Sequence, residues 1–342
     1  DKRDRKFQPT EGYLASFNQK IPIYAEGSSL LNGIDYSAYN AFSDDLIGSI
    51  RVYGRAINSI KNQSTKSGFS LVGVTTPHNI EDNFLDKWLD EGKHATMHWI
   101  AKRKKERKNI YKYFPEVKSI ISLGYNYYTG ENDLNSDSLK ISNYSWGKDY
   151  HLVIKEKMYS IVKFINNYYP DLKYRVCVDT SPILEKYWGQ KAGIGWIGKH
   201  TNLINDKLGS WFFIGEILLD IKLNYDMPFL NDLCGTCTKC IEECPTEALD
   251  EYVLDSNKCI SYLTIEHRGD ISKKLENKLN NWIYGCDICQ QVCPWNIKFS
   301  QESNDENFKM KNELKIMNQN KWEKLSREDY VKIFSKSAIK RT

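Results

Sequence analysis

The sequence lacks a hydrophobic run long enough to cross a membrane. Its most apolar stretch, residues 211–221, is too short to span and carries Glu216 and Asp220, so we expect a buried strand there. Residues 1–10 are charged and lack the apolar core of a secretory signal. We therefore expect a cytoplasmic protein without a membrane anchor. The chain also does not begin with Met, so we expect it to be trimmed.

A strong excess of charge of either sign is also missing. The 342 residues carry 48 Lys and Arg against 44 Asp and Glu, a formal net charge of +4 at pH 7. A nucleic-acid site would therefore have to be a local basic patch and not a field over the whole molecule. No Gly-x-Gly-x-x-Gly motif follows a predicted strand, which disfavours a nicotinamide dinucleotide as cofactor.

Cysteine is scarce in most of the chain and crowded in one part of it. Of the nine cysteines, Cys177 stands alone and the other eight lie between Cys234 and Cys293. In a small secreted protein such crowding would indicate disulfides, but this chain is long and shows no export signal. Metal binding is the better prediction for the eight. Cys177 alternates with Val176 and Val178 and is predicted to be a small core residue.

The spacing of the eight cysteines is typical of a protein with two iron–sulfur clusters. One run reads Cys-x2-Cys-x2-Cys-x3-Cys-Pro from Cys234, and the other reads Cys-x2-Cys-x3-Cys-Pro from Cys286, with Cys259 upstream. In two-cluster ferredoxins the last cysteine of such a run binds the other cluster. The predicted ligands are therefore Cys234, Cys237, Cys240 and Cys293 for one cluster, and Cys244, Cys259, Cys286 and Cys289 for the other. Zinc is the alternative, but it typically takes paired Cys-x2-Cys and does not call for this third cysteine and Cys-Pro.

Strands and helices alternate over residues 68–221, and this apolar periodicity predicts an α/β (α+β) domain ahead of the cysteines. Ser181 and Pro182 suit the N-cap and first position of one of these helices. Residues 130–137 are rich in Gly, Asn, Asp and Ser and are predicted to be a loop. The expected helices are 44–66, 84–92, 150–168 and 182–192, and the expected strands are 68–74, 117–124, 174–178, 202–204 and 211–221.

Changes of composition along the chain predict four segments. Residues 1–42 lack periodicity and are expected to form an N-terminal extension of unknown role. Residues 43–225 are expected to form the α/β domain, and residues 226–300 a ferredoxin-like domain that holds two [4Fe–4S] clusters. Residues 301–342 are polar and charged and are expected to form a C-terminal helical tail.

Two residues and one loop are candidates for the reaction site. Asp179 follows the strand at 174–178, and open α/β sheets bind ligands beyond the carboxyl ends of their strands. A partly desolvated acid there could donate a proton, or it could simply cap the next helix. His151 could contact a cofactor or be structural. The glycines in residues 193–198 would admit a large flat ligand, or they form a plain turn between helix and strand.

The strongest basic patch is Lys-Arg-Lys-Lys-Glu-Arg-Lys at residues 102–108, followed by Tyr111, Tyr113 and Phe114. Cations interleaved with aromatic rings suit RNA, since cations contact phosphates and rings stack on bases. A solvated helix face is the alternative. The predicted RNA contacts are Lys102, Arg103, Lys104, Lys105, Arg107 and Lys108.

These motifs together resemble the epoxyqueuosine reductase (QueG) family. The resemblance runs from about residue 60 to 341, and it does not extend to the first forty or so residues. His200 stands where the family usually has Asn. The family usually continues beyond the final Ala-Ile-Lys-Arg, often into helical repeats, so we expect a short member or a truncated chain. The matching stretches are residues 149–151 (DYH), 178–185 (VDTSPILE), 192–199 (AGIGWIGK), 201–203 (TNL), 259–269 (CISYLTIEHRG), 285–296 (GCDICQQVCPWN) and 334–341 (FSKSAIKR).

The resemblance implies a cobalamin-dependent enzyme with two [4Fe–4S] clusters. Such an enzyme reduces the epoxide of epoxyqueuosine at the wobble position of certain tRNAs to the alkene of queuosine, the last step of queuosine biosynthesis. The resemblance implies that Asp179 is the general acid. It also implies a monomer that takes electrons from a low-potential donor such as a flavodoxin or ferredoxin. The implied cobalamin contacts are Ser142, His151, Gly193, Gly195, Gly198, Lys199, Thr201 and Leu203.

Two alternatives share some of these features. A corrinoid enzyme similar to the reductive dehalogenases would also use cobalamin and two clusters, but it would act on small organohalides and would not need the basic patch. A non-enzymatic electron carrier with a ferredoxin-like module would not need an ordered pocket for a corrin. Binding of tRNA distinguishes the first alternative, and binding of cobalamin distinguishes the second.

Overall fold

The computed structural model describes residues 57–130, 139–315 and 317–341. The predicted extension at residues 1–42 and nearly all of the predicted loop at 130–137 lie outside the described residues. The described part belongs to one compact unit, Tyr53–Thr342. The division of this unit at residues 225 and 300 therefore stays a prediction.

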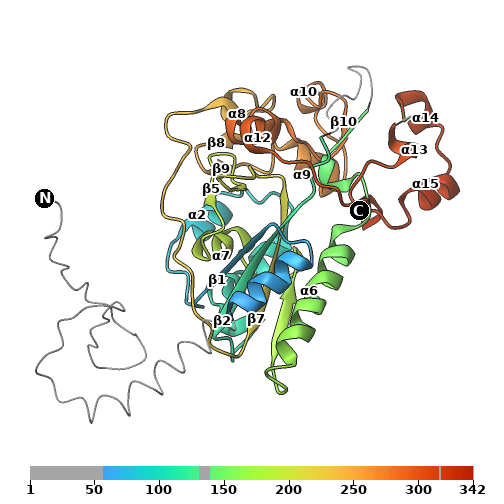
Figure 1. The fold of residues 1–342 in the computed structure, drawn as a ribbon. Helices are drawn as coiled ribbons and strands as arrows, with labels where there is room; N and C mark the ends of the chain where they lie inside the picture. The colour runs from blue at the N-terminus through green and yellow to red at the C-terminus, as the bar shows by residue number, and fades with distance from the viewer. Residues whose placement is uncertain (1–56, 131–138, 316, 342) are drawn as a thin grey trace, which may run out of the picture. The chain divides into compact units, whose positions relative to one another are not determined.

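A four-stranded sheet lies at the centre of the described region, in the order β1-β2-β7-β4 (Figure 1). Its strands are β1 (Leu71–Thr75), β2 (Ser119–Asn126), β7 (Phe212–Leu219) and β4 (Tyr174–Cys177). All three neighbouring pairs are antiparallel. The architecture is therefore α+β, the second form of the predicted fold class. Because β2 and β4 run against β7, both of them point toward the end of the sheet where β7 begins; β2 ends opposite Phe212 and β4 opposite Glu216.

Helix α6 (Tyr150–Asn166) and the helix at residues 57–66 cover one face of the sheet (Figure 1). The apolar residues of α6 recur every three or four positions, which places them on one side of the helix. Ile154 and Met158 are fully buried there against Ile121 and its neighbours in the sheet.

The opposite face of the sheet is covered by α7 (Glu185–Lys191) and α5 (Ile110–Tyr113). Since successive strand residues point to opposite faces, Ile120 and Leu218 turn toward this second layer, where they pack near Trp188. The remaining elements that precede the cysteine-rich segment are α2 (Phe84–Asp90), α3 (His98–Lys102), α4 (Lys104–Lys108), β3 (Lys140–Ile141), η1 (Asn143–Ser145), β5 (Trp196–Ile197) and β6 (Leu203–Ile204).

Helix α7 begins three residues later than the sequence predicts. Its N-cap is Leu184, and no side chain caps it, so the expected cap at Ser181 is wrong. The carboxylate of Glu185 instead accepts the backbone N–H of Asp179 at 2.5 Å. This contact closes the intervening residues into a loop, which replaces the first helical turn that Pro182 would have suited.

The cysteine-rich segment consists of short elements separated by loops, and α8 and α12 lie at one end of the sheet (Figure 1). Strand β10 pairs in parallel with β3, which joins this segment to the chain that precedes α6. The elements of the segment are α8 (Lys239–Glu242), β8 (Leu249–Asp250), β9 (Val253–Leu254), α9 (Ile260–Ile265), α10 (Lys273–Glu276), β10 (Trp282–Tyr284), α11 (Ile288–Gln291) and α12 (Pro294–Phe299).

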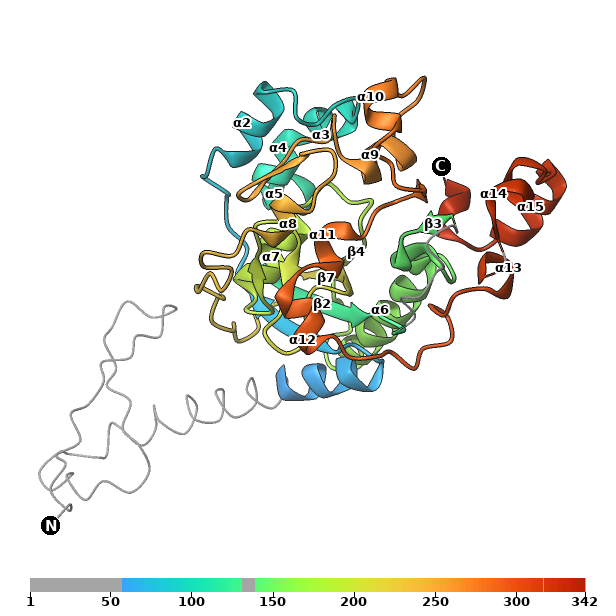
Figure 2. The same ribbon diagram turned by 90° about the horizontal axis from the view of Figure 1, so that it is seen from above.

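The C-terminal segment ends in short helices, and Figure 2 shows three of them, α13, α14 and α15, grouped together beyond β3. Their shared core contains Phe334, which is fully buried, and extends to Trp146 and Tyr284. None of the described helices is both long and apolar enough to cross a membrane. The helices of this segment are α13 (Asn312–Lys315), α14 (Gln319–Glu323), α15 (Arg327–Phe334) and η2 (Ala338–Arg341).

Candidate active site

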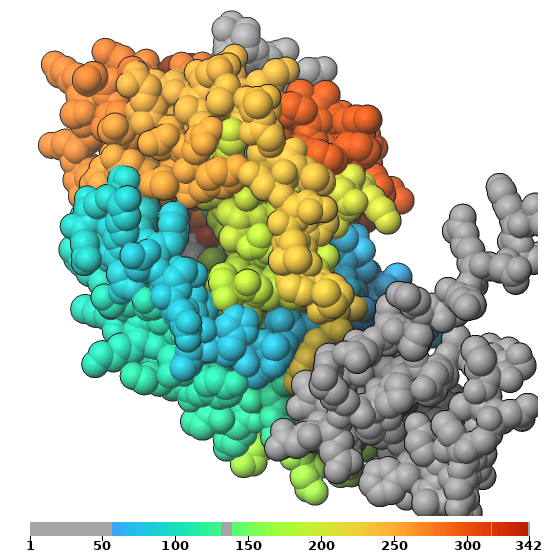
Figure 3. Space-filling view, turned by 90° about the vertical axis from the view of Figure 1, so that its left-hand side faces the viewer, coloured from blue at the N-terminus to red at the C-terminus, as the bar shows by residue number. Residues whose placement is uncertain are grey.

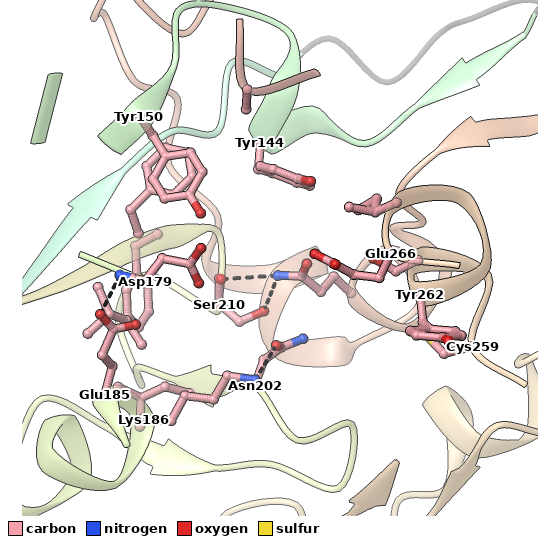
Figure 4. Close-up of a pocket in the computed structure, with 18 of the residues that line it drawn as sticks. Tyr144, Tyr150, Asp179, Glu185, Lys186, Asn202, Ser210, Cys259, Tyr262 and Glu266 are labelled. Carbon is pink, nitrogen blue, oxygen red and sulfur yellow. Dashed lines mark hydrogen bonds between the residues drawn. The ribbon is translucent and has the colours of Figure 1, made fainter. Parts of the chain in front are cut away.

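A cavity of about 600 Å3 opens at the edge of the sheet where β2 and β4 end and β7 begins. Figure 3 shows the surface hollowed between the blue-green segment near α3 and the yellow and orange cysteine-rich segment. Tyr144 and Tyr150 line one side of the cavity, and Cys259 and Tyr262 line the other (Figure 4). The cavity therefore lies between the end of the sheet and the cysteine-rich segment.

Asp179 lies two residues after the end of β4 and lines this cavity (Figure 4). Its backbone φ is 60°, in the left-handed region that Asp tolerates better than most residues. Its side chain is 61% exposed, so a ligand in the cavity can reach the carboxylate. The alternative that Asp179 caps the next helix is wrong, because α7 begins only at Glu185. Strained backbone of this kind persists where the surrounding structure fixes it, often at functional sites.

His151 joins Asp179 to a second carboxylate. Asp149 caps α6 by accepting the backbone N–H of His151 at 3.0 Å, and it also contacts the imidazole Nδ1 at 2.7 Å. The other ring nitrogen, Nε2, lies 3.1 Å from Oδ2 of Asp179.

Burial alone would lower the pKa of His151, but the hydrogen bonds to Asp149 and Asp179 outweigh it and raise the pKa. The protonated imidazole can donate to both carboxylates at once, so a proton is held beside the cavity.

Tyr150 forms the aromatic wall beside this group. Its ring stacks on Phe213 with centroids 4.4 Å apart and on His151 at 4.0 Å. Burial, together with the charge of Asp179 and a hydrogen bond to it, raises the pKa of Tyr150 well above its usual value. The phenol therefore stays neutral next to the acid. Sequence reasoning matched Tyr150 to a motif without assigning it a role.

Two carboxyl groups lie close to Asp179, the half-buried Glu185 and the fully buried Glu216, and the sequence alone assigned a role to neither. Burial and the charge of Asp179 raise the pKa of Glu185 to about 8. Glu216 on β7 has no exposed surface, and its Oε2 finds no partner among the described residues. Burial and the neighbouring Glu185 raise the pKa of Glu216 well above its usual value. A glutamate inside the apolar run of residues 212–219 was the sequence signal that could have revealed this pair.

Lys186 is a cation on the cavity wall that the sequence did not single out. Its Nζ donates to the carbonyl of Thr201 at 2.9 Å and to Oδ1 of Asn202 at 3.2 Å. Lys186 is exposed to the cavity, and desolvation by the surrounding cavity walls lowers its pKa. Through these two contacts α7 is attached to the turn between β5 and β6, which brings Asn202 to the cavity.

Four of the cysteines line a second hollow, of about 320 Å3. They are the four that the spacing predicts for one cluster: Cys234, Cys237, Cys240 and Cys293. Lys199, His200 and Trp295 complete part of its wall. Within the described part of the chain, no three His, Cys, Asp or Glu side chains are arranged to hold a single metal ion. The size of the hollow suits a multi-atom cluster enclosed by four thiolates.

The other four cysteines also lie near one another. Burial raises the pKa of Cys286 to about 12, and the thiols of Cys259 and Cys244 add to the effect. Cys289 is half-buried, and desolvation together with Cys286 and Cys259 raises the pKa of its thiol well above the usual value. All nine cysteines are unpaired, so the disulfide alternative is wrong. Cys177 is fully buried in the core, as predicted.

Comparison with known proteins identifies the family. Residues 233–296 match the family model of a 4Fe-4S double cluster binding domain, and residues 107–180 match that of epoxyqueuosine reductase QueG, DUF1730. The epoxyqueuosine reductase of Leadbetterella byssophila is 41% identical over 285 residues, which cover 83% of this chain and 93% of that protein. That of Cyclobacterium marinum is 40% identical over 287 residues, covering 83% and 91%. The chain belongs to the epoxyqueuosine reductase family.

Solved structures of the family support the fold. An epoxyqueuosine reductase crystallised with a tRNA-Tyr epoxyqueuosine-modified stem loop matches 84% of this chain and 77% of its own, with a TM-score of 0.76 and 24% identity. The epoxyqueuosine reductase of Streptococcus thermophilus matches 82% of this chain and 75% of its own, with a TM-score of 0.71 and 26% identity. The predicted combination of a mixed helix–strand domain with a double-cluster segment is confirmed.

The residues that the family resemblance implies as cobalamin contacts are only partly gathered at the cavity. His151 and Leu203 line it. An added Cβ at Gly195 would lie 2.1 Å from the carbonyl oxygen of Ile204, and one at Gly193 would lie 2.4 Å from that of Met227. These glycines therefore let the backbone pack against other backbone, which favours the plain-turn alternative.

The other implied cobalamin contacts face neighbouring parts of the protein. An added Cβ at Gly198 would meet Cδ1 of Ile204 at 2.4 Å. The hydroxyl of Ser142 donates to the carboxylate of Asp287 in the cysteine-rich segment. Thr201 accepts from Lys186 through its carbonyl, as described above. Lys199 is ion-paired with Glu251 at 2.6 Å and faces the cysteine hollow.

The predicted RNA contacts lie on α3, on α4 and between these helices, and differ in exposure. Lys104 and Lys108 both pair with Asp86, and Arg103 pairs with Glu106 at 2.7 Å. Lys102 and Lys105 are exposed.

The structure corrects the prediction that Arg107 belongs to the exposed basic patch. Its guanidinium is buried against the ring of Trp99, 5.4 Å from the ring centroid. A buried guanidinium cannot serve as a surface phosphate contact in this conformation.

Proposed function

We propose that this chain reduces epoxyqueuosine in tRNA to queuosine, using cobalamin and electrons from two [4Fe–4S] clusters. The observation that carries the proposal is the chain-wide identity with epoxyqueuosine reductases, 41% over 83% of the sequence. The hydrogen-bonded chain Asp149–His151–Asp179 supports it, because it ends at a cavity that also reaches Cys259.

The reaction defines what the protein must supply. Converting an epoxide to an alkene breaks both C–O bonds, forms a C=C bond and releases the oxygen as water. The change consumes two electrons and two protons. The site therefore needs a proton donor next to the epoxide oxygen and a route by which single electrons arrive.

Asp179 is the proton donor in this proposal, and His151 and Asp149 support it. The carboxyl group of Asp179 donates a proton to the oxygen as its bond to carbon breaks. His151, whose pKa is raised by hydrogen bonds to both carboxylates in spite of its burial, can return a proton to Asp179 through Nε2. Asp149 keeps the imidazole in the required orientation through Nδ1. Glu185 holds the backbone of Asp179 at the cavity.

The cavity fits a large ring system. Its aromatic wall of Tyr144, Tyr150 and Phe213 offers flat apolar contacts, and Lys186 and Asn202 offer polar ones. We assign these side chains, with His151 and Leu203, as the ones that would hold cobalamin. When bound, cobalamin supplies a reducible metal centre for the bond-breaking step. Cys259 lines the same cavity, so the cluster to which it is assigned would adjoin the site.

The partners follow from the substrate and the clusters. Exposed Lys102, Arg103 and Lys105 are the members of the basic patch that we assign to phosphate contacts with tRNA. A low-potential flavodoxin or ferredoxin is proposed as the electron donor. We propose a monomer that acts on tRNA in the cytoplasm.

The experiment starts with anaerobic reconstitution of the full chain with iron, sulfide and cobalamin. After reduction, the protein is mixed with tRNA that carries epoxyqueuosine, and the nucleosides are analysed by mass spectrometry. Cluster absorbance, corrin bands and conversion to queuosine would support the proposal. Clusters and corrin without conversion would indicate another corrinoid reductase, such as a dehalogenase. Clusters without corrin would reduce the function to electron transfer.

A further inference from the structure

His200 lies in the turn between β5 and β6 and lines the hollow formed by Cys234, Cys237, Cys240 and Cys293. Only 3% of its surface is exposed. Buried polar groups are normally hydrogen-bonded, so each ring nitrogen of His200 is expected to have a partner.

The hydrogen bonds of His200 fix which nitrogen carries the proton. Its Nδ1 accepts the backbone N–H of Asn202 at 3.2 Å, so Nδ1 has no hydrogen of its own. The proton of the neutral ring therefore sits on Nε2. This Nε2 is buried and finds no hydrogen-bond partner within the described part of the chain. A buried N–H without an acceptor is costly, so the hollow is where its acceptor is expected.

The two lysines that line the same hollow are already accounted for. Lys199 is ion-paired with Glu251 at 2.6 Å. Lys298 is exposed and its Nζ lies over the ring of Phe299. His200 is thus the buried donor on this wall for which no protein acceptor is found among the described residues.

We propose that His200 donates a hydrogen bond from Nε2 to a sulfur atom of the iron–sulfur cluster bound by Cys234, Cys237, Cys240 and Cys293. The inference rests on the cluster assignment in the proposed function. Reduction adds one electron and hence negative charge to the cluster, so the donor stabilises the reduced form more than the oxidised form. The bond raises the reduction potential of this cluster. His200 tunes and positions the cluster and is not a catalytic residue.

The test is a redox titration of the reconstituted full chain, followed by electron paramagnetic resonance (EPR). His200→Asn can still accept from Asn202, but its amide does not reach as far as Nε2. We expect one of the two cluster potentials to fall, with about a tenfold loss in the reduction equilibrium constant, which is about 59 mV for a one-electron couple. The other potential should not move. His200→Gln extends an N–H to the reach of Nε2 and should keep the potential near that of the unchanged chain.

His94→Asn is the matched control. His94 also has a buried ring nitrogen without a partner in the described chain, but it does not line the hollow. The same chemical change at His94 should therefore leave both potentials unchanged.

A second measurement uses the unsubstituted side chain. Protein labelled with 15N in histidine should show, by pulsed EPR, coupling between a histidine nitrogen and one reduced cluster, and His200→Asn should remove it. The inference would be wrong if His200→Asn kept two intact clusters with unchanged potentials and the unsubstituted protein showed no such coupling. That result would leave the proposed function standing. If Cys234→Ser left both clusters intact, the ligand assignment would be wrong, and the inference would fail with it.

Discussion

At the scale of single residues, the proposed chemistry depends on a proton that is held between His151 and two carboxylates. Asp179 exposes its carboxylate to the cavity, and the buried imidazole of His151 connects it to Asp149. The two carboxylates raise the pKa of that imidazole although burial opposes this. A proton is thereby held one hydrogen bond from Asp179, the proposed proton donor.

Replacing His151 with Gln should slow epoxide reduction by about 10²-fold or more, the usual contribution of a positioned acid or base. The protonated imidazole is the working form, so in the unchanged protein the rate should fall as the pH rises through the raised pKa of His151. Single-turnover rates measured across pH test both statements. If His151→Gln kept the rate and the pH profile of the unchanged protein, His151 would take no part in proton supply.

Glu185 gives a prediction about stability. Burial raises its folded pKa to about 8 from a usual value of 4.5. Between these values the folded state keeps a proton that the unfolded chain has lost, so stability falls as the pH rises from about 4.5 to 8. Glu185→Gln should remove this loss, and its Tm relative to the unchanged protein should increase with pH over that window.

A matched substitution on the exposed side of α6, Glu156→Gln, serves as the control for Glu185. It should change the Tm little at any pH, since it leaves no buried group altered. A pH-independent Tm difference for Glu185→Gln would mean that Glu185 ionises alike in the folded and unfolded states.

At the scale of elements, the chain shows which patterns can be read without a structure. The helix α6 and the strands β2 and β7 were predicted because their apolar residues recur with clear helical or strand periodicity. The short helices α3, α4 and α5 were not, since four or five residues are too few to show a period. The start of α7 was misplaced because the tertiary contact of Glu185 with Asp179 overrides local capping preference.

The residues of the candidate site could be predicted where their position or spacing along the chain carries the signal. Eight cysteines carry their grouping in the sequence, since their spacing reflects the ligand geometry. Asp179 was found by its place after a strand. Glu216 and Lys186 were missed because their roles arise from contacts between segments distant in the chain. Arg107 was misjudged because a charge run does not reveal which of its members is buried.

The close approach of the residue before β5 to β6 gives a prediction at this scale. Gly195→Ala should destabilise the protein by about 1–3 kcal/mol, because its Cβ would lie 2.1 Å from the carbonyl oxygen of Ile204 and backbone cannot easily move. At Gly189 in α7 the added Cβ would meet only side-chain carbons, the nearest on Leu203 at 2.6 Å. Gly189→Ala should therefore cost less, and equilibrium unfolding compares the two. Equal losses would contradict the backbone-packing account of Gly195.

At the scale of the whole molecule, Cys259 is the residue that would connect the proposed second cluster to the candidate active site. It belongs to the predicted second cluster and also lines the cavity that contains Asp179. Tyr262, one helical turn further on in α9, lines the same wall. The cysteine-rich segment thus contributes both the proposed cluster ligands and one side of the candidate active site.

Cys259→Ser should lower the bound iron by one cluster and abolish turnover. Cys177→Ala, which alters a buried core cysteine away from both hollows, should keep the full iron content and most of the activity. Iron and sulfide analysis with the single-turnover assay measures both effects. Full iron content in Cys259→Ser would remove Cys259 from the ligand set.

The central claim is that Asp179 delivers a proton to the epoxide oxygen in a cavity supplied with electrons by the clusters. Its most direct test compares Asp179→Asn with the unchanged chain, both reconstituted with clusters and cobalamin, in a single turnover on tRNA that carries epoxyqueuosine. We predict that the variant keeps both cofactors, with unchanged cluster and corrin spectra, and forms no queuosine, because an amide cannot supply the proton. Queuosine formation by Asp179→Asn at the rate of the unchanged chain would contradict the account.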